Sequence, residues 1–269
     1  MINFQIYKNG HLIAFENENN CFKKETFQTL FIFHGLYGRG KNWQTFSKKL
    51  SNEKKQIVVT VDLRNHGGNE FEEDISYILM MNDILSLFNY LGVKNTNLLG
   101  HSMGGKLAMV IALLEPKYVN KVIIADISPI DYDNDENLII NSLLNLNLDL
   151  IKNRGEADNI LSEDIGQKFL RSFLLQNLEL VDGKYKWSLN LKVIKKSLND
   201  LRKFPTIKNI NPIIRLSAVN PINPDVVVTS SGLLWYLTII RTPIKQPMIA
   251  NMISTVQAAL FRKIPCSTV

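Results

Sequence analysis

The sequence predicts an α/β protein with a mainly parallel, doubly wound sheet. Three short apolar runs, Thr29–Phe33, Ile57–Val61 and residues 121–125, have the length and composition of strands buried on both faces. Between the second and third runs, residues 74–92 have the periodicity of a helix. Strands that alternate with helices in this way predict right-handed crossovers and a functional site at the carboxyl ends of the strands.

The composition is that of one full-sized domain. The chain has 269 residues, of which 45% are hydrophobic and 21% charged, so we expect one α/β domain with an inserted cap and no extensive disorder. The net charge is +6, but residues 206–269 hold six basic residues and one acidic residue, and the rest of the chain is nearly neutral. No basic stripe covers the body of the protein, which argues against a nucleic-acid partner.

Cysteine usage and hydropathy indicate a cytoplasmic protein. Only two cysteines occur, Cys21 and Cys266, so a disulfide framework is not expected. The first residues lack the basic and apolar regions of a secretory signal. The longest apolar run, residues 226–240, is shorter than the roughly 20 residues needed to cross a bilayer, so we expect no stable membrane insertion.

The first elements are expected to be a hairpin and two buried strands. Residues 2–7 and 11–15 flank Lys8-Asn9-Gly10, and Asn-Gly between extended segments is the strongest short hairpin signal. Thr29–Phe33 and Ile57–Val61 follow as strands. A polar, glycine-containing loop comes directly after each of them.

The segment 74–92 is expected to be an amphipathic helix that ends at Gly92. Its apolar stripe is predicted to comprise Ile78, Met81, Leu85, Phe88 and Leu91. Residues 97–99 then form a strand, residues 106–114 an apolar helix and residues 121–125 another strand.

Residues 131–201 are predicted to be helical and amphipathic, without a buried strand. They fit a cap over the site, with ordinary outer helices as the alternative. A strand is possible at 213–219, but after Pro205 six of the nine prolines gather in the last 64 residues, and the alternation of strands and helices is lost.

The sequence Gly100-His101-Ser102-Met103-Gly104-Gly105 has the G-x-S-x-G form of a nucleophile elbow. An apolar strand precedes it and an apolar helix follows, which is the context that such a turn requires. A serine on a sharp strand-to-helix turn stands clear of its own backbone and can attack a carbonyl carbon. Ser102 is therefore the predicted nucleophile, and the alternative is a serine in a purely structural turn.

Three other motifs accompany the elbow in a fixed order. The four are HGLYG at 34–38 with Trp43 after it, DLRNHG at 62–67, GHSMGG at 100–105 and DISP at 126–129. Together they resemble the serine esterases of the α/β-hydrolase fold, and most of all the small abhydrolase-type esterases, a bacterial group with mitochondrial relatives. The likeness extends weakly to about residue 205.

The resemblance implies an α/β-hydrolase fold in residues 1–205, with an N-terminal antiparallel hairpin and a helical cap insertion at 131–203. Residues 206–269 do not match the family and form a divergent segment. The implied activity is hydrolysis of a carboxylic ester or thioester through an acyl-enzyme on Ser102, without a metal or cofactor. The implied partner is a small acyl substrate, and the oligomeric state stays open.

By the same resemblance, backbone N–H groups of Leu36 and Met103 form the oxyanion hole, and both side chains contact the acyl group or pack around it. Asp126 takes the role of the triad acid, which orients an imidazole and stabilises its charged form. The alternatives are that Asp126 only caps a turn, or that Asp225 is the acid.

The sequence does not provide the expected base. Its four histidines are His11, His34, His66 and His101, and none follows residue 101. Members of the resembled group have their base near the C-terminus, after a glycine. There His34 and His101 support the site, while the motif of His66 indicates a structural role.

Two explanations compete for the missing base. The chain is either a weakened or inactive hydrolase that binds a ligand or partner, or the product of a frameshift near Lys208, and the joint change in acids, prolines and family likeness favours the frameshift. Acyl transfer and perhydrolysis fit the same residues as hydrolysis. A haloalkane dehalogenase would need Asp in place of Ser102. The glycine spacing fits neither a P-loop nor a dinucleotide-binding turn. No His/Cys cluster has the spacing of metal ligands.

Overall fold

The computed structural model describes residues 1–15, 22, 29–132, 137–207 and 239–240. Its centre is a seven-stranded sheet with the strand order β2-β1-β4-β3-β5-β6-β9. The strands are β1 Phe4–Lys8, β2 His11–Ile13, β3 Thr29–Phe33, β4 Ile57–Val61, β5 Thr96–His101, β6 Val119–Ala125 and β9 Ile239–Ile240. The five strands from β4 to β9 in this order are parallel, and β1 is antiparallel to both β2 and β4. The predicted α/β class and the mainly parallel sheet are confirmed.

The N-terminal hairpin is also confirmed. Strands β1 and β2 pair antiparallel with Lys8 opposite His11. Asn9 and Gly10 between them have φ values of 51° and 82°, the positive φ values that the tight turn of a two-residue hairpin requires.

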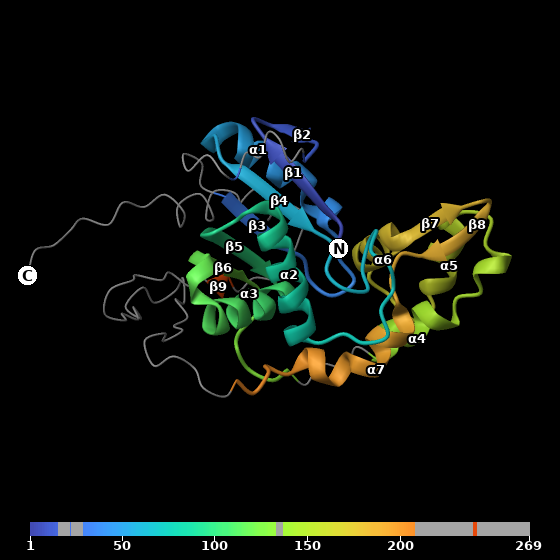
Figure 1. The fold of residues 1–269 in the computed structure, drawn as a ribbon. Coiled ribbons are helices and arrows are strands. Elements are labelled where there is room, and N and C mark those ends of the chain that lie inside the picture. The colour runs from blue at the N-terminus through green and yellow to red at the C-terminus, as the bar shows by residue number, and fades with distance from the viewer. Residues whose placement is uncertain (16–21, 23–28, 133–136, 208–238, 241–269) are drawn as a thin grey trace, which may run out of the picture.

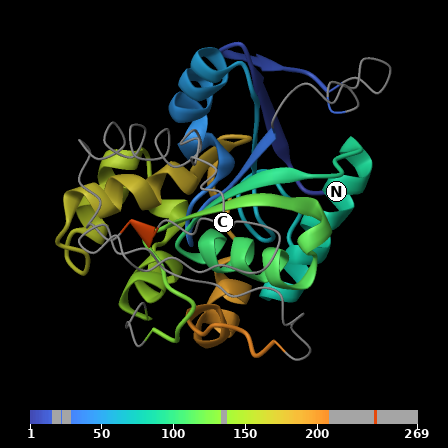
Figure 2. The same ribbon diagram turned by 90° about the vertical axis from the view of Figure 1, so that its left-hand side faces the viewer.

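Helices cover both faces of the sheet. On one face lie α2 Tyr77–Leu91 and α3 Met103–Leu114, and on the other lies α1 Gln44–Lys54, which follows the short 3₁₀ helix η1 Gly40–Trp43. Figure 2 shows this arrangement along the sheet. Every residue of β3 and β4 is buried, as expected for strands covered on both faces.

The apolar stripe of α2 differs from the predicted one. Ile78 is 43% exposed and Leu85 is only partly buried. The buried side chains are Tyr77, Met80, Met81, Ile84, Leu87, Phe88 and Leu91. Apolar residues are so frequent in this segment that two neighbouring helical stripes are possible. The stripe with more apolar side chains packs against the sheet. Gly92 ends the helix with φ 73°, as predicted.

The cap lies beside the carboxyl edge of the sheet (Figure 1). Its helices are α4 Asn137–Asn145, α5 Arg154–Leu161, α6 Lys168–Leu174 and α7 Leu191–Arg202, with the 3₁₀ helices η3 Leu148–Leu150 and η4 Leu175–Asn177. A further 3₁₀ helix, η2 Pro116–Tyr118, precedes β6. The cap has its own apolar cluster, which includes Ile140, Leu174 and Ile194.

The prediction of an all-helical cap is wrong in one respect. Strands β7 Leu178–Val181 and β8 Lys184–Trp187 form an antiparallel hairpin within it. Asp182 and Gly183 turn the chain with φ values of 52° and 78°. Asp-Gly is a hairpin signal, but Leu180 and Val181 are exposed, so these strands lack the continuous buried pattern that marked the others.

Most of the divergent segment lies outside the described residues. This includes the possible strand at 213–219, the alternative acid Asp225 and Cys266, while Ile239–Ile240 pairs with β6. Cys21, near the N-terminus, also lies outside the described residues. In the part of the chain that the structure describes, no helix is long and apolar enough to span a membrane.

Candidate active site

Ser102 lies at the turn between β5 and α3, with φ 50° and ψ −119°. This conformation is outside the regions that L-residues normally adopt, and such strain is typical of functional sites. The Ser102 N–H donates to the carbonyl of Ala125 at the end of β6 (3.0 Å), and the Ser102 carbonyl accepts from the N–H groups of Gly105 and Lys106. The strained turn is therefore fixed by the neighbouring strand and by the first turn of α3.

Glycines let three backbone segments meet at this turn. A Cβ atom on Gly100 would lie 2.2 Å from the Gly104 carbonyl oxygen, and one on Gly104 would lie 2.4 Å from the Phe33 carbonyl oxygen. Both distances are impossible for real carbon atoms. The start of α3 can therefore pack directly against β5 and the end of β3 only because these positions carry no side chain.

The loop after β3 contacts the serine itself. A Cβ atom on Gly35 would lie 2.8 Å from His101 Nδ1 and 3.1 Å from Ser102 Cβ. Leu36 follows immediately, and its partly buried side chain packs against both the sheet core and the cap cluster. The structure thus brings the predicted oxyanion residue Leu36 next to the elbow, on the boundary between sheet and cap.

Met103 is the first residue of α3 and is 4% exposed. The first N–H groups of an α-helix have no intrahelical acceptor, and the helix dipole makes this end electropositive. The second predicted oxyanion residue therefore lies where a developing negative charge is favourable, directly after Ser102.

The cap fixes the backbone of the same loop. Tyr37 has φ 59°, and its carbonyl accepts a 2.7 Å hydrogen bond from Asn177 Nδ2 of η4. Asn177 is 1% exposed and also donates to the carbonyl of Leu174. Sequence reasoning missed Asn177, because its partner is 140 residues away and no local motif marks it.

Asp126 follows β6 with φ 57°, and its side chain is 42% exposed. Its Oδ2 lies 4.0 Å from His101 Nε2, which is longer than a hydrogen bond. Ser102 is hydrogen-bonded to Ala125, the residue before Asp126. The predicted acid and the predicted nucleophile therefore lie at the ends of adjacent strands.

His34 is a buried scaffold residue. Its Nε2 accepts from the N–H of Leu63 at 2.9 Å, and its Nδ1 donates to the carbonyl of Gly35 at 2.8 Å. Burial lowers the pKa of His34, so the ring is neutral and joins the loops after β3 and β4. Both of its nitrogens are occupied, which removes it as an acceptor for the serine proton.

The rings of His66, which is buried, and of His101, whose side chain is 22% exposed, are neutral at pH 7 as well. Burial, together with a smaller effect of the nearby His34, lowers the pKa of His66 to about 3 and that of His101 to about 4. His66 Nδ1 donates to the Arg64 carbonyl at 2.8 Å. His101, in contact with Gly35 and near Asp126, is the imidazole next to the proposed nucleophile.

Asp62 has a structural function. It is 4% exposed and accepts hydrogen bonds from the N–H groups of Gly40 and Gly68 and from Asn3 Nδ2, all at 2.7–2.8 Å. Its carboxylate therefore holds the loop after β4 and does not contact the elbow.

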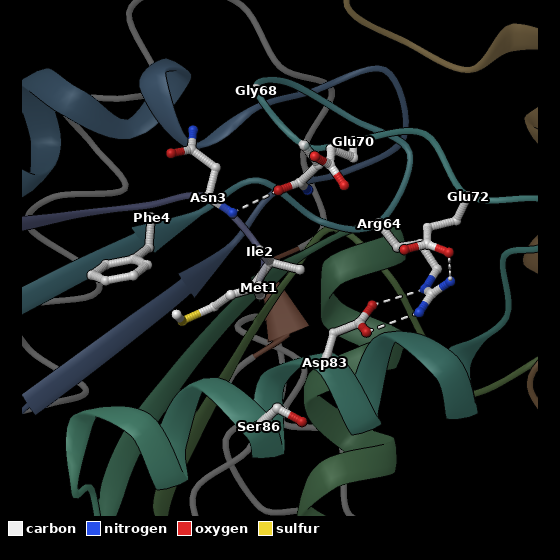
Figure 3. A pocket seen from close by; sticks show the side chains of 11 residues that line it. Met1, Ile2, Asn3, Phe4, Arg64, Gly68, Glu70, Glu72, Asp83 and Ser86 are labelled. Carbon is white, nitrogen blue, oxygen red and sulfur yellow. Dashed lines mark hydrogen bonds and ion pairs between the residues drawn. The ribbon is translucent and has the colours of Figure 1, made fainter.

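A cavity of about 630 Å³ lies beside β1 and the loop after β4 (Figure 3). Arg64 points into it and forms two hydrogen bonds with Asp83 of α2, at 2.8 and 2.9 Å, and an ion pair with Glu72 at 3.4 Å. Neither Ser102 nor Asp126 lines this cavity. These contacts of Arg64 join the loop after β4 to α2. Among the described residues, no group of three or more His, Cys, Asp or Glu is placed to hold a metal ion.

Known proteins resemble the chain over most of its length. The family model described as "alpha/beta hydrolase fold" matches residues 28–213. A Xenopus laevis protein named sn-1-specific diacylglycerol lipase ABHD11 is 34% identical over 199 residues, which cover 71% of this chain. This chain spans only 64% of that relative's length.

Two further matches cover a larger share of the matched protein's own length. An abhydrolase domain-containing protein of Schizosaccharomyces pombe is 31% identical over 202 residues, which cover 73% of this chain and 74% of the relative. The solved structure of a marine microorganism esterase has a TM-score of 0.74 at 27% identity and covers 95% of this chain and 98% of that one. With the strained serine turn and the parallel sheet, these matches establish that the chain belongs to the alpha/beta hydrolase fold family.

Proposed function

We propose that the protein is a serine hydrolase that cleaves carboxylic ester or thioester bonds through an acyl-enzyme on Ser102. The observation that carries this proposal is the strained position of Ser102, with Gly35 in contact on one side and the end of β6 bonded on the other. The names of the relatives, a diacylglycerol lipase and an esterase, support ester substrates.

In the proposed reaction, Ser102 Oγ attacks the carbonyl carbon of the substrate and loses its proton to a base. The carbonyl oxygen becomes an oxyanion that accepts hydrogen bonds from the N–H groups of Met103 and Leu36. Collapse of this intermediate breaks the bond to the leaving alcohol or thiol, which takes up the proton. Water then attacks the acyl-serine, and the carboxylic acid is released.

The base limits this reaction. The sequence has no histidine after residue 101, and His34 uses both nitrogens in the scaffold. His101 is neutral at pH 7, but with a pKa of about 4 it is a weak proton acceptor. Loss of a triad member lowers turnover by up to about 10⁶-fold, so we expect slow turnover compared with a hydrolase that has a complete triad.

A fluorophosphonate probe tests the proposal, because it reacts covalently with an activated serine. We expect wild-type protein to be labelled and Ser102→Ala not to be labelled, as measured by intact-mass spectrometry. Ser86→Ala, a change on α2 beside the charged cavity, is the control and should be labelled like wild type. Folded wild-type protein that stays unlabelled would refute the enzyme and favour a hydrolase-fold protein that only binds an acyl ligand.

The substrate class and the setting are part of the same proposal. We infer a small-molecule acyl substrate and, from the low cysteine content, a cytoplasmic setting. p-Nitrophenyl esters and acyl thioesters of matched chain length, assayed side by side, separate the two bond types. Equal rates for Ser102→Ala and wild type on both would contradict the assignment of the nucleophile.

A further inference from the structure

Lys106 is a buried lysine that the proposed acyl transfer does not use. It lies one turn after Ser102 on α3 and is 1% exposed. An ammonium group removed from water is costly unless other groups compensate its charge. The groups around Lys106 therefore indicate its function.

The ammonium group of Lys106 lies at the C-terminal end of α7, the last helix of the cap. Lys106 Nζ donates a hydrogen bond to the carbonyl of Arg202, the last residue of α7. The last carbonyl groups of a helix have no intrahelical donor, and the helix dipole makes this end electronegative, so a cation is favourable there. Tyr77 of α2 donates from its hydroxyl to the preceding carbonyl, that of Leu201, at 2.6 Å.

Both connections between sheet and cap meet at this point. Tyr132, where the chain enters the cap, donates its N–H to the same Arg202 carbonyl at 3.2 Å, and its ring centre lies 5.1 Å from Lys106 Nζ. Asp131 Oδ1 accepts from the N–H of Phe204, where the chain leaves the cap, at 2.9 Å. The incoming and outgoing segments are thus bonded to each other and to α3.

The junction continues to the active site. The Tyr132 hydroxyl accepts from the N–H of Ser128 at 2.9 Å, two residues after Asp126. Lys106 in turn shares its helix with Met103, which follows Ser102 directly. A shift of the cap would therefore act on the segments that carry both the proposed acid and the proposed nucleophile.

We propose that Lys106 is a positioning residue that fastens both cap connections to the nucleophile helix and so sets the position of the cap over Ser102. Its effect on substrates rests on the proposed function, because the cap and Leu36 would then bound the acyl pocket. Burial lowers the pKa of Lys106 to about 8, and the charge of Asp131 opposes this decrease. At neutral pH the amine therefore carries mainly its positive charge.

Hydrogen exchange of the whole protein tests the fastening without any need for activity. Lys106→Met leaves an unbranched apolar side chain one atom shorter and removes the hydrogen bond and the charge. We expect exchange in residues 128–132 and 198–204 to rise about five- to tenfold, which is the effect of one lost hydrogen bond. Unchanged exchange at both connections in Lys106→Met would overturn the proposal.

The control separates fastening from general stability. Removal of one partner from a buried charged contact also lowers global stability, so the local effect has to be separated from the global one. Leu50→Ala removes a buried side chain from α1, on the far face of the sheet, and lowers stability through a cavity. It should leave exchange at the two connections at the wild-type level after correction for global unfolding, and a rise like that of Lys106→Met would contradict the proposal.

A second variant covers the case in which Lys106→Met does not fold. Asp131→Ala changes an exposed side chain and removes the acceptor for Phe204, so it should loosen the same two connections. Wild-type exchange in Asp131→Ala would refute a common fastening point.

Kinetics then distinguish positioning from a merely structural effect. For Lys106→Met we expect KM to rise about tenfold for long-chain esters with little change for acetate esters, and Lys106→Arg should restore part of the loss. Equal loss of kcat on every ester, without a KM effect, would contradict positioning of the cap. Wild-type protein that does not react with fluorophosphonate refutes the proposed function, and the exchange comparison still decides the role of Lys106.

Discussion

At the scale of single residues, Gly35 determines how closely the oxyanion loop approaches the serine. Alanine at this position would place a methyl carbon 2.8 Å from His101 Nδ1 and 3.1 Å from Ser102 Cβ. We expect Gly35→Ala to slow fluorophosphonate labelling at least about 100-fold, because loss of one oxyanion donor has an effect of this size. Gly166→Ala is the matched control, since no atom lies within 4 Å of its Cβ position and it should label normally. Normal labelling of Gly35→Ala would show that the loop can retreat without loss.

Asn177 is the second residue with a defined role, because its amide holds the Tyr37 carbonyl from the cap side. We expect Asn177→Ala to slow labelling and to lower the free energy of unfolding by about 1–3 kcal/mol, the cost of leaving buried polar groups without partners. Urea unfolding and labelling rates measure the two effects. The neighbouring Gln176→Ala alters a hydrogen bond between exposed side chains and should change neither. A stability loss without slower labelling would limit Asn177 to a structural role.

Sequence could predict some of these residues and not others. The elbow around Ser102 is local, since six consecutive residues determine its turn, and it could be recognised from those residues alone. Asn177 acts on a carbonyl 140 residues earlier, and Lys106 on one 96 residues later. Such contacts form only after the cap has folded onto the sheet, so no spacing in the sequence encodes them. The one local sign for Lys106 is a cation at the start of an otherwise apolar helix.

At the scale of elements, variants of α2 can show which apolar stripe of this helix faces the core. Ile84 is fully buried, whereas Ile78, predicted for the core face, is 43% exposed. We expect Ile84→Ala to lower the free energy of unfolding by about 2–5 kcal/mol, and Ile78→Ala to change it by less than about 0.5 kcal/mol. Urea unfolding at neutral pH measures both variants. A larger loss for Ile78→Ala than for Ile84→Ala would restore the predicted stripe.

The elements that sequence missed have a common physical feature. Buried parallel strands such as Ile57–Val61 are apolar at almost every position and could be located to the residue. The cap hairpin β7–β8 is partly exposed and alternates with charged residues, so only its Asp182-Gly183 turn distinguishes it from a helical segment. A strand that is buried on only one face is stabilised by the segment that packs on that face. A local sequence pattern does not show which segment this is.

At the scale of the whole molecule, three histidines with lowered pKa values link stability to pH. Burial lowers the pKa values of His34, His66 and His101, to about 3 for His66 and about 4 for His101. In the unfolded chain a histidine titrates near 6.5. Between these values the unfolded state binds more protons than the folded state, so the stabilisation is complete above pH 6.5 and is lost as the pH falls toward 4.

We therefore expect the free energy of unfolding to fall as the pH decreases from 6.5 to 4. Most carboxylates titrate only at the lower end of this range. His66→Asn tests the link, because the asparagine amide can still donate to the Arg64 carbonyl but binds no proton. Its stability curve should be flatter than that of wild type by up to about 1.4 kcal/mol for each pH unit over which the two states of His66 differ in protonation. His11→Asn, on the exposed strand β2, is the matched control for replacing a histidine by asparagine. Urea unfolding at half-unit steps from pH 7.5 to 4 supplies the curves, and equal slopes for His66→Asn and wild type would mean that the buried ring takes up its proton without unfolding.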